Sequence, residues 1–434
     1  MKRSQAVLAA AIAAVIAGVF PFGCSRPRLP PVPPPAHPFV RYPYVQAVTD
    51  SSGDVLWATE RSTRDTLTYW IEGIADTIRI ADPVPVDRHR ARLRGLSPDA
   101  AVGYRVRAGG VATGVEVFRT APVRGAPDSL DVLIWGDSGW GSEAQVDLAR
   151  QMERLHDVAL ALHTGDIAYE DGSEVAFTQR YFRVYRRFLA RVPVYPVPGN
   201  HDVRTDGGRP MDEAFVLPGA AETAGRRYYS FDWGQAHFIA LDSNEEGGVR
   251  SDLRVRGRQY RWLVCDLSVA AADPRTRWIV VYLHHPPYSA GTGLSGHGSD
   301  RTLRDVLAPV FDRYEVDLVF SGHDHIYERS HPIRAGAVDT AGPGVVYVVT
   351  GGGGASQHWR GAGRAWHTAV SARAYEFVLL RIAPDRMAAE VVDRNGVRLD
   401  AFSVRPRRDR AASAYGEEQT CRREPSLRGS VDER

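Results

Sequence analysis

The sequence predicts two consecutive domains of different class, an all-β domain followed by a larger α/β domain. The chain has 434 residues, more than the roughly 100–200 that one domain usually holds. Residues 39–122 contain short β-rich segments separated by turn formers, whereas residues 129–405 contain continuous apolar runs with helix-like stretches between several of them. The first pattern is typical of an antiparallel sandwich, and the second of sheets covered by helices.

Composition indicates a globular chain without a strongly charged surface. Hydrophobic residues make up 44% of the sequence, and 54 basic residues stand against 52 acidic ones, which leaves a formal net charge of +2. A balance so close to neutral supplies no strong field for polyanions. We therefore expect no nucleic-acid partner.

The N-terminus has the pattern of a secretory signal. Two basic residues precede an apolar run, Ala6–Phe20, which is shorter than the about 20 apolar residues of a membrane span. Cys24 then predicts a lipoprotein-type signal over residues 1–24, although Pro21 stands where an aliphatic residue is usual, and ordinary cleavage remains open. The Pro-rich residues 25–38 would form an extended linker. We expect an extracytoplasmic protein, a cell-envelope lipoprotein, periplasmic or secreted, that contacts a membrane only through this anchor.

The cysteine content excludes a disulfide-rich scaffold, because the chain has 3 cysteines. Cys265 lies in an apolar segment and is expected to be a buried thiol, while a disulfide with Cys421 remains open. Residues 406–434 are polar and rich in Arg and Glu, so we expect a disordered tail there.

Residues 39–122 are expected to form an immunoglobulin-like sandwich of about seven short strands. Trp57 and Tyr104 are expected to belong to its core and not to a site. The segment Leu93–Pro98, followed by Tyr104, resembles the strand–loop–tyrosine signature of fibronectin type III modules.

In the second domain, polar residues follow directly after the apolar runs. They form five clusters at the predicted strand ends: Gly136–Gly139, Gly165–Tyr169, Gly199–Asp202, Val281–His284 and Gly322–His325. Sheets of this class build their sites just past the carboxyl ends of strands. The glycines in four of the clusters allow sharp turns that aim a side chain back over those ends.

Each cluster offers oxygen or nitrogen donors that suit first-row transition metals. Taken alone, Asp137 would be a turn residue or a helix cap, and His284 a core histidine. His323 and His325 alternate along an extended segment, so their rings would point the same way. Five donor-rich clusters at strand ends favour one shared metal centre over separate structural roles.

The ordered motifs G-D-x-G, G-D-x-x-Y, G-N-H-D, V-x-x-H and G-H-x-H resemble those of purple acid phosphatases, within the calcineurin-like metallophosphoesterases. The similarity covers about residues 39–400, including the fibronectin-like module, and continues through Gly322–Ser330. Tyr169, at the end of the second motif, is its specific mark. The resemblance implies an α/β fold, a four-layer αββα metallophosphoesterase sandwich, preceded by an all-β fibronectin III-like sandwich.

The resemblance also implies two metal ions and names the ligands of each. A ferric ion would be held by Asp137, Asp166, Tyr169 and His325, and a divalent ion (Fe, Zn or Mn) by Asp166 as the bridge together with Asn200, His284 and His323. Carboxylates and a phenolate are hard donors that suit a trivalent ion, while imidazoles and an amide suit a divalent one.

Two histidines are candidates for acid–base chemistry. His201, next to Asn200, is expected to be the general acid and a phosphate contact, with Asp202 orienting it. His297 is the second candidate, in a Gly/Ser loop, Tyr288–Ser299, that is longer than in plant members, whose adjacent histidine pair lies closer to the ligand. His285 is a weaker candidate, whose expected role is packing or support of a ligand. Glu328 and Arg329 are expected to be structural and not catalytic.

The expected function is hydrolysis of small phosphate monoesters by attack of a metal-bound hydroxide. One alternative is a phosphodiesterase or nucleotide hydrolase on the same metal core. A second alternative, from another class, is a surface-anchored binding module whose metal site is vestigial. No predicted ligand position is missing, which favours an enzyme.

Overall fold

The computed structural model describes residues 38–407, without Ala75 and without residues 220–226, 245–251, 292–296 and 358–364. The predicted signal, most of the Pro-rich linker and residues 408–434 of the predicted tail therefore lie outside the described residues. In the part of the chain that is described, no helix is both long and apolar enough to cross a membrane.

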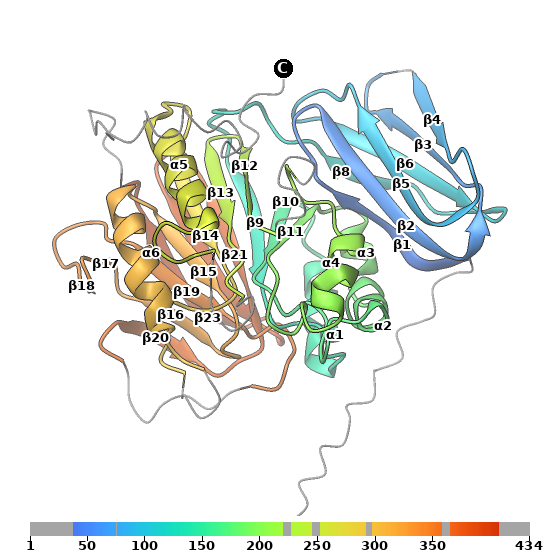
Figure 1. Cartoon of the computed structure of the whole chain (residues 1–434). Coiled ribbons are helices and arrows are strands. Elements are labelled where there is room, and N and C mark those ends of the chain that lie inside the picture. The colour runs from blue at the N-terminus through green and yellow to red at the C-terminus, as the bar shows by residue number, and fades with distance from the viewer. Residues whose placement is uncertain are drawn as a thin grey trace, which may run out of the picture.

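An antiparallel β sandwich opens the described chain (Figure 1, blue). One sheet has the order β1-β2-β5, and the other has the order β4-β3-β6-β7 with β8 beside β6. The strands are β1 (Phe39–Gln46), β2 (Ser52–Thr63), β3 (Thr66–Ile71), β4 (Thr77–Ala81), β5 (Val86–Arg94), β6 (Ala101–Ala108), β7 (Val111–Ala112) and β8 (Glu116–Arg119). Alternate residues of β5 and β6 are buried, as expected for strands with one face on a core.

The core of the sandwich contains the two aromatic residues predicted to lie there. Trp57 is 3% exposed and Tyr104 is 0% exposed. The Tyr104 hydroxyl donates a hydrogen bond to the carbonyl of Ala190 at 2.7 Å, and the Tyr44 hydroxyl donates to the carbonyl of Ala214 at 2.8 Å. Both acceptors belong to the second domain, so buried tyrosines join the two domains.

The second domain contains two sheets that face each other. Their orders are β11-β10-β9-β21-β22-β23 and β12-β13-β14-β15-β19-β16-β20. The first sheet comprises β9 (Leu130–Trp135), β10 (Val158–His163), β11 (Val194–Pro196), β21 (Glu376–Ile382), β22 (Met387–Asp393) and β23 (Arg398–Val404). The second comprises β12 (Tyr229–Trp233), β13 (Ala236–Ala240), β14 (Trp278–Tyr282), β15 (Leu318–Ser321), β16 (Tyr327–Ser330), β19 (Val346–Thr350) and β20 (Thr368–Ala372). A short hairpin, β17 (Ile333–Arg334) and β18 (Ala337–Val338), lies apart from both.

Helices cover the outer face of each sheet (Figure 1). On the side of the first sheet lie α1 (Glu143–Met152), α2 (Glu174–Ala176), the π-helix η1 (Phe177–Phe182), α3 (Arg186–Leu189), the 3₁₀ turn η2 (Asp206–Gly208) and α4 (Arg209–Ala214). On the side of the second sheet lie α5 (Arg258–Ala272) and α6 (Arg301–Arg313). The helix-like stretches predicted at Glu143–His156 and Asp300–Tyr314 are therefore α1 and α6.

The continuous apolar runs arise because both faces of the central strands are buried. In β14, Val280 packs between the two sheets, while its neighbours Ile279 and Val281 pack under α5 and α6. In β9, Val132 and Leu133 divide in the same way between the inter-sheet core and the core under α1. This four-layer α/β/β/α arrangement confirms the predicted fold class.

Two details differ from the predictions. Cys265 is buried, but it is disulfide-bonded, so the prediction of a free thiol is wrong; its partner lies outside the described residues. Arg407, placed in the disordered tail, is 7% exposed and donates a hydrogen bond to the carbonyl of Val316 at 2.8 Å. A buried guanidinium with a backbone acceptor keeps this residue on the folded domain.

Candidate metal centre

The seven predicted donors meet at one edge of the two facing sheets. Each follows a strand from the parallel part of its sheet, where the carboxyl ends point the same way. Asp137 follows β9, Asp166 and Tyr169 follow β10, Asn200 follows β11, His284 follows β14, and His323 and His325 follow β15. Strands far apart in the sequence thus deliver their donors to one place.

The first group of donors contains a carboxylate, a phenol and an imidazole. The Tyr169 hydroxyl donates to Asp137 Oδ1 at 3.0 Å and also lies 3.0 Å from His325 Nε2. His325 Nε2 is 3.4 Å from the same Asp137 oxygen. Burial, followed by the negative charge of Asp137, raises the pKa of Tyr169 well above its usual value, so the phenol holds its proton unless a cation displaces it.

The second group contains an amide and two imidazoles. Asn200 Oδ1 lies 3.1 Å from His284 Nε2 and 3.1 Å from His323 Nδ1, and the two ring nitrogens are 3.3 Å apart. Asp166 Oδ2 is 3.5 Å from His284 Nε2, and carboxylate or imidazole atoms of Asp137, Asp166 and His284 lie within 4.8 Å of one another. Asp166 therefore connects the two groups, as its predicted bridging role requires.

Backbone carbonyls fix which nitrogen of two histidines faces the donors. His284 Nδ1 contacts the carbonyl of Thr164 at 2.9 Å, and His325 Nδ1 contacts the carbonyl of Ser356 at 2.5 Å. A carbonyl only accepts, so each Nδ1 carries a hydrogen and each Nε2 is turned toward the donor set. In a neutral His284, Nε2 is an acceptor that faces another acceptor, Asn200 Oδ1, at 3.1 Å. A second proton on His284 or a cation between the two atoms removes this repulsion.

The electrostatics of this edge call for positive charge. Asp137 and Asp166 are 0% and 2% exposed, and in the described part of the chain neither carboxylate forms an ion pair with Arg or Lys. Burial tends to lower the pKa of His284, but Asp166 raises it to about 9. The burial of Asp166 acts to raise its own pKa, yet His284 holds that pKa below its usual range. Buried carboxylates need such a partner, and the donor set fits two cations.

Three of the seven donors have left-handed backbone, which non-glycine residues rarely adopt. The φ angles are 55° at Asp137, 51° at Asp166 and 69° at His323. Such conformations cluster at functional sites because surrounding structure must hold them. Gly199 makes one close approach possible, since a Cβ there would lie 2.1 Å from Asp166 Oδ1.

His201 lies beside this edge, as predicted, but its orienting partner is different. His201 Nδ1 contacts the carbonyl of Glu170 at 2.6 Å, so Nδ1 carries the hydrogen, and Nε2 is 3.9 Å from Asp166 Oδ2. Arg204 Nη2 donates to that Nε2 at 3.3 Å. The backbone carbonyl of Glu170 therefore takes the place that the sequence analysis gave to Asp202.

Asp202 instead joins the loops that carry the donors. Its carboxylate is fully buried and accepts hydrogen bonds from the backbone N–H groups of Ile167 at 2.9 Å, Ala168 at 3.0 Å and Gly199 at 2.8 Å. The expectation that Asp202 orients His201 is corrected by these contacts. Asp202 has this role and not the predicted one because a buried carboxylate can accept hydrogen bonds from several backbone N–H groups at once.

The second candidate acid, His297, also lies at the edge. Its Nδ1 is 3.1 Å from Asp324 Oδ1, and its ring centroid is 4.6 Å from that of His323. Asp324 also accepts from the Ser289 hydroxyl and from the Gly298 N–H at 3.0 Å, so one buried carboxylate holds both ends of the loop that carries His297.

Three residues expected to pack have the expected surroundings. The ring of His285 lies against His323 with centroids 4.5 Å apart, and its Nδ1 is 2.9 Å from Ser243 Oγ. Glu328 accepts from the Ala290 N–H at 2.6 Å, and Arg329 binds Asp400 at 2.7 Å. The contact with Ala290 means that Glu328 holds the first residues of the loop Tyr288–Ser299, which carries His297.

Sequence reasoning missed several residues that brace the site. His163 Nδ1 accepts from the Gly165 N–H at 3.2 Å, so its Nε2–H donates to Ser138 Oγ at 2.8 Å. Burial lowers the pKa of His163 to about 3, which keeps this bridge neutral. Gly353 donates to the carbonyl of Gly136 at 2.9 Å. These contacts depend on ring orientation or on the backbone, which no motif encodes.

Comparison with known proteins agrees with this arrangement. Residues 130–327 match the family model of the calcineurin-like phosphoesterases. An uncharacterised protein of Mycobacterium tuberculosis is 29% identical over 313 residues, which cover 62% of this chain and 58% of that protein. Acid phosphatase type 7 of Homo sapiens is 29% identical over 316 residues, with 68% and 70% of the two chains covered. Purple acid phosphatase 23 of Arabidopsis thaliana is 29% identical over 299 residues, with 61% and 62% covered.

Solved structures share the fold. A purple acid phosphatase from yellow lupin (Lupinus luteus) seeds superposes with a TM-score of 0.73 at 19% identity, covering 86% of this chain and 75% of the other. The structure of PhoD superposes with a TM-score of 0.63 at 12% identity, covering 90% and 98%. The resemblance predicted from the five motifs is confirmed by the family match and the relatives together.

Proposed function

We propose that this chain, whose residues 130–327 form a calcineurin-like phosphoesterase domain related to the purple acid phosphatases, hydrolyses phosphate monoesters at two metal ions. One observation carries the proposal: a carboxylate–phenol–imidazole group and an amide–diimidazole group meet at a single carboxylate, Asp166. If these side chains served only as a structural ion pair, one of the two donor groups would be enough, and the second would have no role.

The two groups differ in the ion that they suit. A ferric ion would be held by Asp137, Tyr169 and His325, a divalent ion (Fe, Zn or Mn) by Asn200, His284 and His323, and both by Asp166. When bound, the ions would polarise the phosphate oxygens and lower the pKa of a water in the site. The Thr164 and Ser356 carbonyls would keep His284 and His325 in the tautomers that such binding requires.

His201 is the proposed proton donor to the leaving oxygen. Because the Glu170 carbonyl binds Nδ1–H, Nε2 is the nitrogen that exchanges a proton with the substrate. The side chain is 21% exposed, so a substrate can reach it. Arg204, whose Nη2 lies 3.3 Å from that nitrogen, places a permanent positive charge where a phosphate oxygen would bind.

His297 is the proposed second proton donor, and its ring lies beside that of His323 with centroids 4.6 Å apart. Asp324 Oδ1 lies 3.1 Å from its Nδ1 and so fixes the orientation of the imidazole ring. Because Asp324 also binds Ser289 and Gly298, the position of this histidine depends on the loop, and the loop would select among substrates. We propose small phosphate esters as those substrates, an extracytoplasmic location, and membrane contact only through Cys24.

Loss of a donor tests the site directly. Asp166→Ala and His323→Ala should each reduce hydrolysis of p-nitrophenyl phosphate below about 1% of the wild-type rate, since removing a residue that only orients a metal ligand already costs about 10–100-fold. Metal content, measured by mass spectrometry, should fall in parallel. Asp206→Ala, at a carboxylate whose side chain is 57% exposed, is the matched control. Full activity at full metal content in either donor variant would refute the assignment.

Two further measurements separate the finer parts of the proposal. A visible charge-transfer band that disappears in Tyr169→Phe would support ferric iron on Tyr169, whereas a colourless, active and fully metallated enzyme would exclude it. Comparing p-nitrophenyl phosphate with bis(p-nitrophenyl) phosphate from acidic to mildly alkaline pH tests ester class. Faster turnover of the diester would overturn the monoester assignment but leave the phosphoesterase assignment in place.

A further inference from the structure

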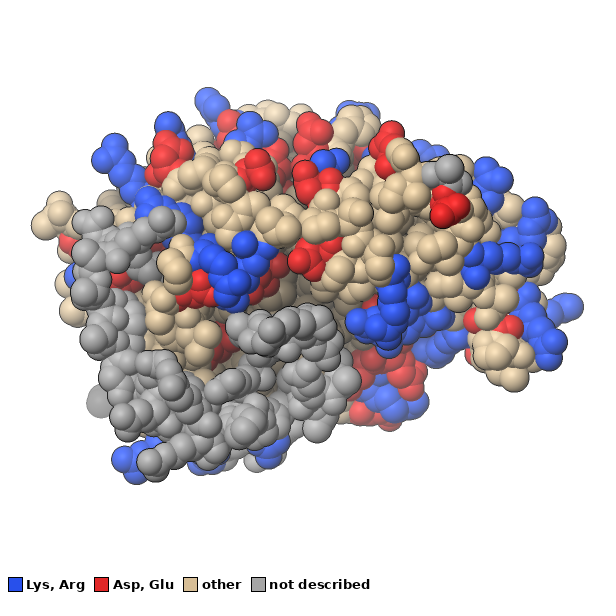
Figure 2. Space-filling view, turned by 90° about the horizontal axis from the view of Figure 1, so that it is seen from above, with Lys and Arg blue, Asp and Glu red and all other residues tan. Residues whose placement is uncertain are grey.

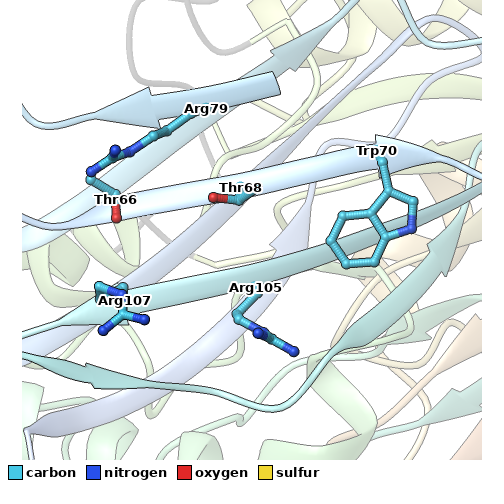
Figure 3. A pocket seen from close by; sticks show the side chains of 6 residues that line it. All are labelled: Thr66, Thr68, Trp70, Arg79, Arg105 and Arg107. Carbon is cyan, nitrogen blue, oxygen red and sulfur yellow. The ribbon is translucent and has the colours of Figure 1, made fainter. Parts of the chain in front are cut away.

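The outer face of the sheet β4-β3-β6 carries a hollow of about 390 Å³ lined by basic, hydroxyl and aromatic side chains: Thr66, Thr68, Trp70, Arg79, Arg105 and Arg107. We call this surface the arginine face; Figure 3 shows its side chains. It belongs to the N-terminal sandwich and has no part in the metal centre. Its volume lies at the small end of the range of about 300–1,000 Å³ that small-molecule pockets occupy.

Strand register places the three guanidinium groups around a row of hydroxyls. Thr68 pairs with Arg79 on β4 and with Arg105 on β6, and Thr66 pairs with Arg107. Cross-strand partners lie on the same side of a sheet about 4.5–5.5 Å apart at Cβ. A ligand in the hollow would therefore meet positive charge from both sides and a hydroxyl from the floor.

The three arginines have no acidic partners among the described residues, although neighbouring arginines of the same sandwich do. Arg90 binds Asp54 at 2.8 Å and Arg119 binds Asp99 at 2.6 Å. On the face of the molecule shown in Figure 2, basic and acidic side chains also lie beside one another in many places. Arginines that gather without a carboxylate repel one another and do not help the sandwich to fold. They are instead available to an anionic ligand, for which the planar guanidinium is well suited.

Trp70 adds a flat apolar platform at one end of the hollow. Its partner across β6 is Gly103, and a Cβ at that glycine would lie 2.5 Å from the indole ring. The missing side chain lets the indole lie down on the sheet, and Figure 3 shows the ring face-on beside Arg105. A ring held in this way presents one face for stacking and does not protrude.

We propose that the arginine face binds an acidic saccharide, whose sugar ring stacks on Trp70 while its carboxylate or sulfate groups bind the arginines. A membrane fits less well, because surface insertion needs apolar side chains that protrude, and Trp70 lies flat. A nucleic acid also fits less well, because nucleic-acid-binding proteins carry an extended basic stripe and a high pI, whereas this chain has a net charge of +2. The hollow suits a ligand of one or two rings.

The test measures binding of the full chain to short oligogalacturonate and to a heparin oligosaccharide by isothermal titration calorimetry. The variant Arg79→Gln/Arg105→Gln/Arg107→Gln should bind the preferred saccharide at least about tenfold more weakly, since each charged hydrogen bond carries measurable affinity. Its control is Arg150→Gln/Arg386→Gln/Arg398→Gln, which removes the same charge from exposed arginines of the second domain and should bind as the wild type does. Hydrolysis of p-nitrophenyl phosphate should be unchanged in both, which shows that they are folded.

Trp70→Leu tests the stacking platform while keeping Gly103 covered. It should weaken saccharide binding at least about threefold, as expected when an aromatic stacking contact is lost, and retain phosphate-ester hydrolysis. The proposal is overturned if neither saccharide binds the wild type, or if the two triple variants bind equally well. It is also overturned if single-stranded DNA or phosphatidylglycerol vesicles bind the arginine face more tightly than both saccharides do.

Discussion

Replacement of Asp202 distinguishes a bracing role from a catalytic one. In Asp202→Ala the backbone N–H groups of Ile167, Ala168 and Gly199 lose a buried acceptor that now lies 2.8–3.0 Å away. A buried donor left unsatisfied costs about 1–3 kcal/mol, so three of them cost at least about 3 kcal/mol. For a domain of this size, each kcal/mol lowers Tm by about 2–4 °C, which gives a decrease of at least about 6 °C.

Asp202→Asn should have an intermediate effect. Oδ1 accepts from both Ile167 and Ala168, so an asparagine keeps those bonds with its carbonyl oxygen. Its amide group would then face the Gly199 N–H, which leaves one donor unsatisfied at about 1–3 kcal/mol. The order of thermal stability should be wild type, Asp202→Asn, Asp202→Ala, measured by differential scanning calorimetry.

His201→Gln provides the contrast. If Asp202 braces the loops, His201→Gln should lose activity at unchanged Tm, while Asp202→Ala should lose activity, metal content and Tm together. A Tm for Asp202→Ala within about 1 °C of the wild type, compared with the exposed control Asp206→Ala, would refute the bracing role. Loss of activity alone, equal to that of His201→Gln, would restore the orienting role predicted from the sequence.

Two further predictions concern stability away from the metal centre. His237 is buried between Asp232 at 2.8 Å and Asp266 at 2.9 Å; burial acts to lower its pKa, but the two carboxylates raise it to about 10. Because this folded-state pKa exceeds the unfolded value of about 6.5, the stabilisation by His237 is complete below pH about 6.5 and is lost as pH rises through about 10. The difference in the free energy of unfolding by urea between wild type and His237→Gln should therefore shrink over that range. A constant difference would contradict a charged histidine. Tyr104→Phe removes the bond to the Ala190 carbonyl and should destabilise the chain by about 1–3 kcal/mol in the same assay, whereas no change would mean that the tyrosine does not join the domains.

The donors of the site were predictable because of where they occur in the sequence. Asp137, Asp166 and His284 each follow an apolar run, and the direction of parallel strands then brings them to one edge. Tyr169 could be predicted because it closes a motif that already contained Asp166. Side-chain chemistry and strand ends together determine this part of the site, and both can be read along the chain.

The supporting contacts could not be predicted because they depend on the backbone. The carbonyls of Thr164, Ser356 and Glu170 determine three histidine tautomers. Every residue has a backbone carbonyl, so the residue types at these positions do not reveal the contacts. Asp202 was assigned to His201 because the two are adjacent in the sequence, but adjacent residues on a turn commonly point in different directions. The disulfide of Cys265 could not be settled for a similar reason, since an apolar segment predicts burial but not a partner.

The left-handed donors and the bracing residues are two parts of one arrangement. Left-handed backbone at Asp137 and Asp166 costs roughly 1–2 kcal/mol for each residue, and neither would be held without contacts between the loops. The Asp137 N–H donates to the carbonyl of Gly165 at 2.9 Å, and the Ser138 N–H donates to the carbonyl of Asp166 at 3.1 Å, so each strained loop is bound to the other. Asp202 then binds the second of these loops to Gly199. The donor geometry is therefore set by hydrogen bonds between loops, and a cation that enters would add its own binding energy to positions that the protein has already fixed.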